Sequence, residues 1–288
     1  MFGWFVTAVL VILVLTIVLS VETLSPSRCW SDLHAPLNFC MYQQRAHAYA
    51  PDVVDVWIPK PWRPRDKGIP CTWETYPDAT YAVLCSHGNA EDLQTCSRMH
   101  RDMCQDLKLN VLGWDYSGYG LNQETYFERS VDGINMSLRT LYEWLRREQG
   151  FASEHIIVWG YSLGTGPTLD LAAYVCRDLR ATLGGVILVS AYTSILDTAE
   201  EWAGAWVKKC FAERWDNRTA IGAVTCPVLL MHGQHDKLIP AQHSKTLLNL
   251  APGDAVLTLF PNVGHTSFRW SETRVVVQRW LKKHGMRS

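Results

Sequence analysis

A short turn with a serine at its centre is the strongest chemical signal in the chain. Residues 160–164 read Gly-Tyr-Ser-Leu-Gly, after an apolar run at 155–159 and before a helical pattern at 165–179. A Gly-x-Ser-x-Gly sequence between a strand and a helix is typical of a nucleophile elbow, which lifts the serine hydroxyl clear of the sheet. Ser162 is therefore the candidate nucleophile for acyl transfer. The alternative interpretation is an ordinary Gly/Ser turn.

A serine hydroxyl needs a base to take its proton, and the base needs an acid to orient it. After a nucleophile elbow, the acid and then the histidine follow in chain order. Asp236 comes just after a predicted strand at 227–231, and His265 just after a predicted strand at 255–260. Both lie at the carboxyl ends of strands, the same sheet edge as Ser162, and we predict these three residues as a catalytic triad. The alternative for His265 is a loop histidine with an ordinary hydrogen bond.

Other polar residues fit these roles less well. His243 falls within a predicted helix, and Asp254 precedes its strand and so lies at the opposite edge of the sheet. His232 and His235, next to Asp236, could suggest metal ligands, but no further motif supports a metal site. We therefore expect no metal and no cofactor.

The negative charge that develops on an acyl oxygen needs two backbone N–H donors. One is expected from Leu163, the residue after the nucleophile, and the other from the loop after an earlier strand. Residues 86–90 read Ser-His-Gly-Asn-Ala and follow a predicted strand at 81–85, so the Asn89 N–H is the second candidate for this oxyanion hole. Gly88 lets the backbone approach the site closely. A simple helix N-cap at Asn89 is compatible with that role.

Strand and helix patterns alternate along the rest of the chain. Strands are expected within 51–60 and at 81–85, 110–116, 155–159, 185–190, 227–231 and 255–260, and helices at 91–107, 130–147, 165–179, 240–250 and 273–283. The stretch 59–70 is rich in proline and charge and predicts a loop. Apolar strands separated by amphipathic helices indicate a mostly parallel sheet covered on both faces.

One long segment, residues 191–226, interrupts this alternation. An excursion of that length between two strands is usually functional, and its position suggests a small lid over the carboxyl ends of the strands. It contains five aromatic residues, Tyr192, Trp202, Trp206, Phe211 and Trp215. They could line an apolar slot for an acyl chain, or they could pack the lid onto the body. The sequence spacing leaves both interpretations open.

The composition is that of a globular chain, with 48% hydrophobic and 19% charged residues and a formal net charge of -1 in 288 residues. Without a Lys/Arg-rich stripe there is no electrostatic reason to expect a nucleic-acid partner. The nine cysteines form no Cys-x-x-Cys pair, which argues against zinc-ribbon or thioredoxin chemistry. Two Asn-x-Ser/Thr sequons begin at Asn135 and Asn217 and, if used, would face the lumenal or outer side.

The N-terminus has the composition of a membrane segment. No charged residue occurs before Glu22, and residues 4–21 are almost entirely apolar. As a helix this run would span about 27 Å, close to the hydrocarbon thickness of a bilayer. We therefore expect a signal anchor at 1–22 that holds the protein as a single-pass membrane protein in the lipid bilayer. The alternative is a signal peptide that is cleaved before secretion. A juxtamembrane segment at 23–50 and a catalytic domain at 51–288 would follow.

Several motifs in combination resemble one family. They are Ser-His-Gly-Asn-Ala-Glu-Asp at 86–92, Trp-Asp-Tyr-Ser-Gly-Tyr-Gly at 114–120, Gly-Tyr-Ser-Leu-Gly-Thr-Gly-Pro at 160–167 and Cys-Pro-Val-Leu-Leu-Met-His-Gly at 226–233. From about residue 52 to 280 the chain resembles the α/β-hydrolase-domain serine hydrolases, in the branch that holds membrane-anchored members and protein depalmitoylases. Two departures are Gly-His-Thr-Ser at 264–267, where the family often has Gly-His-Asn-Asp, and an apolar N-terminus in place of a cysteine cluster.

This resemblance implies an α/β-hydrolase fold, with a mostly parallel central sheet flanked by helices and a small lid. The apolar N-terminal run adds the expectation of a transmembrane helix before this fold. The resemblance also implies the triad and oxyanion assignments given above. The expected function is a serine hydrolase that cleaves an acyl ester or thioester substrate among acylated lipids or proteins. A serine peptidase or amidase with the same triad is the main rival, since the fold does not fix which bond is cleaved. A non-catalytic scaffold would have no need of the intact triad.

Overall fold

The computed structural model describes residues 49–50, 53–122 and 130–286. The chain divides into units of residues 1–43 and 44–288, and all the described residues belong to the second unit. Within them, a central eight-stranded sheet has the order β1-β2-β4-β3-β5-β6-β7-β8. The strands are β1 (Val56–Ile58), β2 (Ile69–Glu74), β3 (Ala82–Ser86), β4 (Asn110–Trp114), β5 (Ile156–Tyr161), β6 (Gly185–Val189), β7 (Val228–Gly233) and β8 (Ala255–Phe260).

The sheet is mostly parallel, as predicted. Strands β4, β3, β5, β6, β7 and β8 run parallel to one another, whereas β1 pairs antiparallel with β2, and β2 with β4. The central strands β3, β4 and β6 are buried at every position. Such continuous apolar strands are expected where helices cover both faces of a parallel sheet. The carboxyl ends of the parallel strands consequently meet at one edge.

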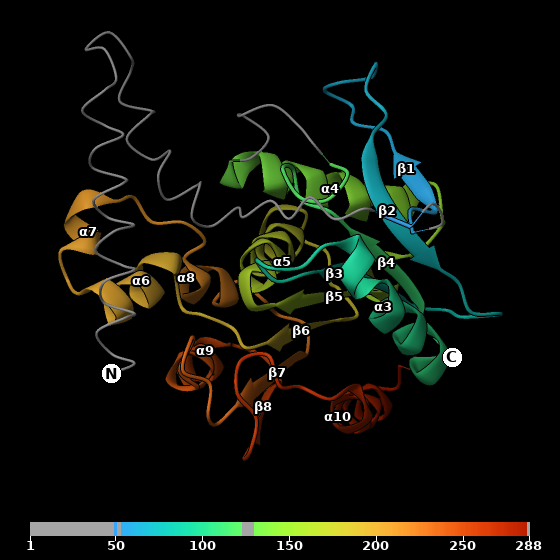
Figure 1. Cartoon of the computed structure of the whole chain (residues 1–288). Coiled ribbons are helices and arrows are strands. Elements are labelled where there is room, and N and C mark those ends of the chain that lie inside the picture. The colour runs from blue at the N-terminus through green and yellow to red at the C-terminus, as the bar shows by residue number, and fades with distance from the viewer. Residues whose placement is uncertain (1–48, 51–52, 123–129, 287–288) are drawn as a thin grey trace, which may run out of the picture. The chain divides into compact units, whose positions relative to one another are not determined.

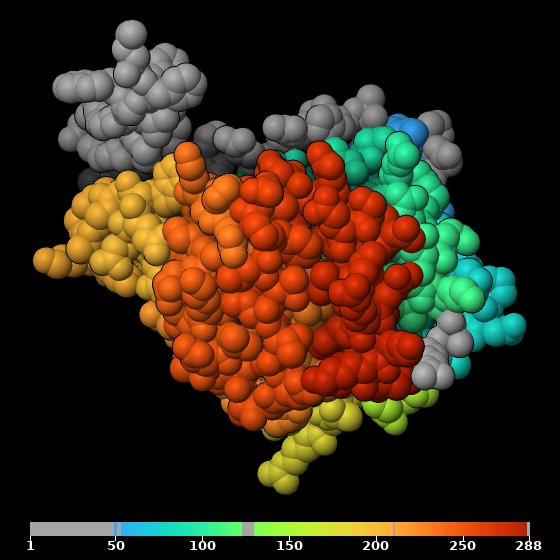
Figure 2. Space-filling model, turned by 90° about the horizontal axis from the view of Figure 1, so that it is seen from below, coloured from blue at the N-terminus to red at the C-terminus, as the bar shows by residue number. Residues whose placement is uncertain are grey.

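Helices cover both faces of the sheet (Figure 1). They are α3 (Leu93–Leu107), α4 (Val131–Arg147), α5 (Thr165–Ala173), α6 (Ile195–Ala203), α7 (Val207–Cys210), α8 (Asn217–Ile221), α9 (Gln242–Leu250) and α10 (Trp270–Lys283). Helices α3 and α10 contact each other on one face, and α4, α5, α8 and α9 follow one another in contact on the other. On the side seen in Figure 2, the surface comes mainly from the last third of the chain, coloured orange to red.

The main hydrophobic core lies between the sheet and the pair α3 and α10. It joins alternate strand residues such as Val83 and Trp159 to helix residues such as Met103, Val277 and Trp280. At about 25 cal/mol per Å² of buried apolar surface, a core of this kind is the main term that stabilises the fold. It fixes the strands whose carboxyl ends carry the predicted site residues.

Two elements differ from the sequence expectation. Strand β2 was not predicted, because Pro70 within it lacks an N–H for the ladder and makes the segment read as a loop. The predicted helix at 165–179 ends as an α-helix at Ala173 and continues as a π-helical turn at Tyr174–Asp178. Outside the segment 191–226, for which no strand or helix was predicted, the remaining strands and helices begin and end within a few residues of the predicted bounds.

The predicted single-pass membrane localisation is wrong by the length and hydropathy of the described helices. In the part of the chain that the structure describes, no helix is both long and apolar enough to cross a bilayer. The longest described helix, α4, has 17 residues and carries Asp132, Arg146 and Arg147 at its ends. The predicted anchor at 1–22 lies outside the described residues, as do residues 23–48 of the predicted juxtamembrane segment at 23–50.

The asparagines of the two sequons take part in hydrogen bonds inside the fold. The sequon residue Asn135 accepts a hydrogen bond from Trp215, and Asn217 donates one to the Tyr192 carbonyl. Both asparagines are buried, so the folded chain does not present them to a glycan.

Six cysteines in the described ranges are free thiols, and five of them are buried. These five behave as small core residues.

Candidate active site

Ser162 follows strand β5 in a strained backbone conformation. Its φ is +51°, in the left-handed region that residues other than glycine rarely adopt. This backbone conformation costs about 1–3 kcal/mol. A Cβ at Gly160 would lie 2.6 Å from the Gly164 carbonyl oxygen, so the turn admits only glycine there. Ser162 begins a short 3-10 helix, and the Thr165 hydroxyl donates to its carbonyl at 2.7 Å. This is the geometry of a nucleophile elbow.

The structure brings the three predicted catalytic side chains into one line. The Ser162 Oγ lies 2.9 Å from His265 Nε2, and His265 Nδ1 lies 2.7 Å from Asp236 Oδ2. Asp236 follows strand β7, and His265 follows strand β8. The sequence separations are 103 and 29 residues, so only the shared edge of the sheet brings these groups together.

Asp236 is held as a carboxylate. Burial alone would raise its pKa, but hydrogen bonds from His232, His265 and the Ile239 N–H hold that pKa well below its usual range. The Leu238 and Ile239 N–H groups both donate to Oδ1 at 2.9 Å. Since the carboxylate can only accept, His265 carries its proton on Nδ1 and leaves Nε2 free to accept from the serine.

Two residues that support this line were not assigned a role from the sequence. Tyr161 stacks on the His265 ring with centroids 5.7 Å apart, and its hydroxyl donates to the His265 carbonyl at 3.0 Å. His232 is fully buried, with Nε2 3.4 Å from Asp236 Oδ2 and 2.8 Å from the Ile239 carbonyl oxygen. Their positions, directly before Ser162 and four residues before Asp236, are the only sequence signals that point to them.

The two predicted oxyanion donors lie on adjoining segments. Leu163 directly follows Ser162, and Asn89 lies in the turn after strand β3. A Cβ at Gly164 would collide with the carbonyl oxygens of Ser86 and His87, so the elbow packs against the backbone of this turn. No described residue accepts a hydrogen bond from the Asn89 N–H. The helix cap is not Asn89 but Asp92, whose side chain accepts from the Thr95 N–H at 2.9 Å.

Comparison with known proteins identifies the fold. Over 175 residues, the chain is 34% identical to alpha/beta hydrolase domain-containing protein 17B of Xenopus tropicalis. This match covers 59% of this chain and 55% of that protein. The chain is 30% identical over 207 residues to alpha/beta hydrolase domain-containing protein 17C of Mus musculus, 70% of this chain and 59% of that protein. The solved structure of a thermophilic esterase from Thermogutta terrifontis matches with a TM-score of 0.58 at 19% identity, covering 75% of this chain and 94% of that one.

The chain has the α/β-hydrolase fold. A second solved structure, Est1E from Butyrivibrio proteoclasticus, matches this hydrolase fold with a TM-score of 0.58 at 14% identity, covering 75% of this chain and 94% of that one. No family model matches the chain. The chain spans 55% and 59% of the lengths of the two curated relatives named above. These findings confirm the resemblance predicted from the motifs and support a hydrolase.

A second serine in this chain provides an internal comparison. Ser190 follows β6, the strand beside β5, is buried and has a φ of +50°. Within the described part of the chain, its Oγ has no hydrogen-bond partner. Strained backbone and burial therefore do not distinguish Ser162, whereas the imidazole 2.9 Å from its Oγ does.

Four of the five aromatic residues of the segment 191–226 divide into two groups. Tyr192 and Trp215 are buried, and a Cβ at Gly166 on α5 would touch both side chains. These two pack the segment onto the body of the domain. Trp202 and Trp206, in contrast, are 46% and 45% exposed. The Trp202 indole N–H donates to the Leu238 carbonyl at 3.0 Å, two residues from Asp236.

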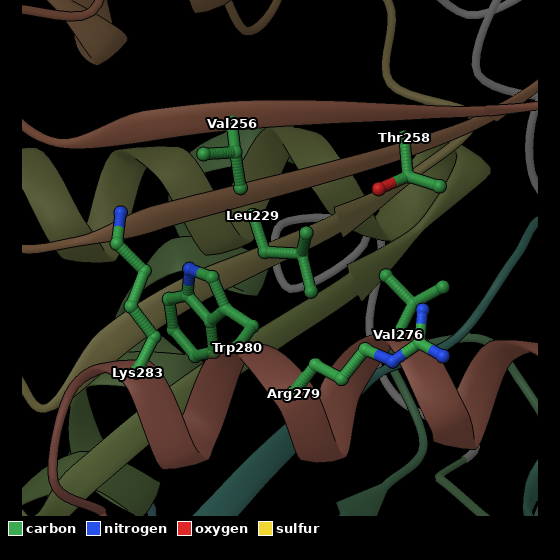
Figure 3. Close-up of a pocket in the computed structure, with 7 residues that line it drawn as sticks. All are labelled: Leu229, Val256, Thr258, Val276, Arg279, Trp280 and Lys283. Atoms are coloured by element: carbon green, nitrogen blue, oxygen red, sulfur yellow. The ribbon is translucent and has the colours of Figure 1, made fainter.

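A pocket of about 280 Å³ lies apart from these residues (Figure 3). In Figure 3, side chains of α10 stand on one side and those of β7 and β8 on the other. The lining residues are Leu229, Val256, Thr258, Val276, Arg279, Trp280 and Lys283. None of them belongs to the predicted triad or oxyanion hole. Among the described residues, no group of three His, Cys, Asp or Glu side chains could hold a metal ion.

Proposed function

We propose that this chain is a serine hydrolase that cleaves carboxylic ester or thioester bonds of acylated lipids or proteins. The observation that carries the proposal is the continuous line of hydrogen bonds from Ser162 through His265 to Asp236, with lengths of 2.9 and 2.7 Å. A serine hydroxyl in such a line can attack an acyl carbonyl at neutral pH. The hydrolase class of the relatives adds support.

The proposed reaction forms and then breaks an acyl-enzyme. His265 Nε2 takes the proton as Ser162 Oγ bonds to the acyl carbon, and the Asp236 carboxylate stabilises the resulting imidazolium. The imidazolium then gives this proton to the leaving alcohol or thiol, and the bond from the acyl carbon to that group breaks. Water, deprotonated by His265, attacks the acyl-enzyme in the second half, and Ser162 leaves with the proton.

The backbone N–H groups of Asn89 and Leu163 are the proposed oxyanion donors. Each would donate to the acyl oxygen when it becomes negative in the tetrahedral intermediate. Loss of one such donor typically costs a factor of 10² to 10³ in kcat. The contact of Gly164 with the Ser86 and His87 carbonyls supports this pairing, because it fixes the two donor segments against each other.

We also propose that residues 191–226 form a lid within a hydrolase domain at 51–288, and that Trp202 and Trp206 contact the acyl chain. Their exposure supports the slot interpretation for these two residues, whereas Tyr192 and Trp215 serve packing. The hydrogen bond from Trp202 to the Leu238 carbonyl supports a position near the Asp236 loop. An acyl chain is apolar, so exposed indole rings near the site would favour it.

The test is hydrolysis of an ester, a thioester and an anilide that carry the same acyl group. Wild type should turn over the first two, and Ser162→Ala should lose at least about 10³-fold in kcat, because removal of the nucleophile leaves only background catalysis. Turnover of the anilide in preference to the ester would favour the amidase alternative. Retention of wild-type kcat by Ser162→Ala would refute the proposal.

A further inference from the structure

The segment that follows strand β4 contains a motif with no part in the proposed reaction steps. Residues 114–120 read Trp-Asp-Tyr-Ser-Gly-Tyr-Gly. Strands β3 and β4 are parallel neighbours, with Cys85 opposite Gly113. Their carboxyl ends meet at the same edge of the sheet, so the segment after β4 runs beside the turn after β3. That turn, residues 86–89, carries the proposed oxyanion donor Asn89.

Polar groups of the segment after β4 bind the turn at successive positions. Trp114 Nε1 donates to Ser86 Oγ at 3.2 Å. The Tyr116 hydroxyl donates to the His87 carbonyl oxygen at 2.5 Å, and the Tyr119 hydroxyl donates to Asn89 Oδ1 at 2.5 Å. We call Trp114, Tyr116 and Tyr119 the cradle.

The His87 and Tyr116 rings also stack, with centroids 4.1 Å apart at an angle of 27°. The contacts with the cradle therefore follow the turn from its first residue to its oxyanion donor.

The start of helix α3, which follows the turn, is fixed from the same segment. Asp115 Oδ1 accepts from the Leu93 N–H at 2.9 Å, where helix α3 begins, and Oδ2 accepts from the Tyr49 hydroxyl at 2.6 Å. The cradle side chains are at most 2% exposed, so water does not compete for their polar groups. Because an unpaired polar group is costly in such an interior, the hydrogen bonds restrict the turn to one conformation.

We propose that Tyr119 is a positioning residue for the oxyanion hole and that it acts through the side chain of Asn89. Its hydroxyl holds the Asn89 amide group and thereby fixes the direction of the backbone N–H of the same residue. Tyr119 does not contact the substrate. The inference rests on the proposed function, because it assigns a support to that site.

This role predicts a specific kinetic pattern. The Asn89 N–H matters most when the acyl oxygen becomes charged, so a displaced donor lowers kcat and leaves KM nearly unchanged. Complete loss of a donor costs about 10² to 10³ in kcat, and displacement should cost less, about 10- to 100-fold. A residue that only stabilised the fold would instead lower the unfolding temperature without this split between kcat and KM.

The experiment compares Tyr119→Phe with Tyr142→Phe on a short-chain ester. Tyr142 is a matched control, since its buried hydroxyl is 2.7 Å from Ser153 Oγ, away from the turn. We expect Tyr119→Phe to lose 10- to 100-fold in kcat, with KM within about twofold, and to lose affinity for an alkylboronic acid, a mimic of the tetrahedral intermediate, by a similar factor. Tyr142→Phe should keep kcat within about twofold at a comparable unfolding temperature. A Tyr119→Phe enzyme with wild-type kcat, or with kcat and unfolding temperature changed as in Tyr142→Phe, would overturn the inference.

A double-mutant cycle tests whether Tyr119 acts through Asn89. Asn89→Ala keeps the backbone N–H but removes the amide that Tyr119 binds, so the double variant should lose no more kcat than Asn89→Ala alone. Additive losses would overturn the proposed path. Ser162→Ala, measured on the same ester, separates the two proposals. Turnover that survives in Ser162→Ala overturns both, whereas turnover lost there and kept in Tyr119→Phe overturns only the role of Tyr119.

Discussion

Two regions of this molecule carry aromatic side chains and use them in opposite ways. In the cradle, Trp114, Tyr116 and Tyr119 are at most 2% exposed, and each donates a hydrogen bond to the turn at 86–89. In the segment 191–226, Trp202 and Trp206 are 46% and 45% exposed. The Trp206 indole N–H donates within its own segment, to the Ala203 carbonyl.

The difference shows that residue type does not reveal what an aromatic side chain does. The partner of its polar atom and the exposure of its ring carry the information. A buried ring whose hydroxyl or indole N–H holds a neighbouring loop positions that loop, whereas an exposed ring beside the site offers apolar surface to a ligand. The cradle should therefore affect the reaction with every acyl group, and the exposed tryptophans only the preference among acyl groups.

The largest expected effect separates packing from exposure within the segment 191–226. Trp215→Ala should lower the free energy of unfolding by about 3–5 kcal/mol, because it leaves a cavity and an unpaired Asn135 Oδ1. Trp202→Ala should cost less than about 1 kcal/mol, since the ring is half in solvent. Urea denaturation of both variants measures the difference. Equal losses would mean that the two groups of aromatics are not distinct.

The next effect concerns the contact between the elbow and the turn. The Cβ of Gly164→Ala would collide with the Ser86 and His87 carbonyls and push the turn away, so kcat/KM should fall at least 10²-fold. Gly222→Ala is the control, because its Cβ would have 3.4 Å to its nearest neighbour, the Thr219 carbonyl oxygen. Kinetics of both variants on one ester decide the matter. A Gly164→Ala enzyme as active as Gly222→Ala would contradict the described contact.

A smaller effect is a pH dependence of stability that originates at Asp115. Burial raises the pKa of Asp115 to about 7, although hydrogen bonds from Tyr49 and the Leu93 N–H oppose the rise. The folded state therefore holds a proton that the unfolded state releases near pH 4, so this residue makes folding less favourable as pH rises from about 4 to 7. Burial also lowers the pKa of the adjacent His87 to about 4. This residue therefore makes folding more favourable as pH rises, which opposes the effect of Asp115.

Comparison of variants isolates the contribution of Asp115. Between pH 5 and 8 the unfolding free energy of Asp115→Asn should rise relative to wild type by about 2–3 kcal/mol. The change arises over about two pH units, from 5 to the folded-state pKa, at 1.36 kcal/mol per unit. Denaturation at the two pH values measures this difference. A difference that does not change with pH would show that Asp115 is ionised throughout the range.

The smallest effect tests the selectivity of the exposed tryptophans. Trp202→Ala and Trp206→Ala should lower kcat/KM for octanoyl esters by about 3- to 10-fold and leave acetyl esters unchanged, since about 1 kcal/mol of apolar contact is lost. Tyr119→Phe should lower kcat/KM for both esters by the same factor. If the tryptophan variants treat both esters alike, or if wild type does not prefer the longer chain, the acyl-slot proposal fails.

Much of this arrangement follows from the sequence, and what does not follow has identifiable physical causes. Alternating strands and helices predicted the parallel sheet, and strand β8 has the predicted bounds. Ser162, Asp236 and His265 could be singled out because each lies within a few residues of the carboxyl end of a strand, and the sheet brings those ends together.

The cradle could not be predicted in the same way. Its hydrogen bonds join residues about 30 positions apart, and no local periodicity encodes which hydroxyl meets which carbonyl. The sequence did show 114–120 as a motif, but only the structure gives its partner. Likewise, the spacing of the five aromatics in 191–226 could not separate packing from exposure, because both depend on tertiary contacts.

The central claim is that Ser162 is the nucleophile because His265 activates it. Labelling with a fluorophosphonate probe, followed by mass spectrometry of the modified peptide, tests this directly in wild type, Ser162→Ala and Ser190→Ala. We expect one adduct on Ser162 in wild type and in Ser190→Ala, because Ser190 shares the burial and backbone conformation but has no imidazole partner. Ser162→Ala should remain unlabelled. Equal labelling of Ser162→Ala and wild type, or an adduct on another residue, would contradict the account.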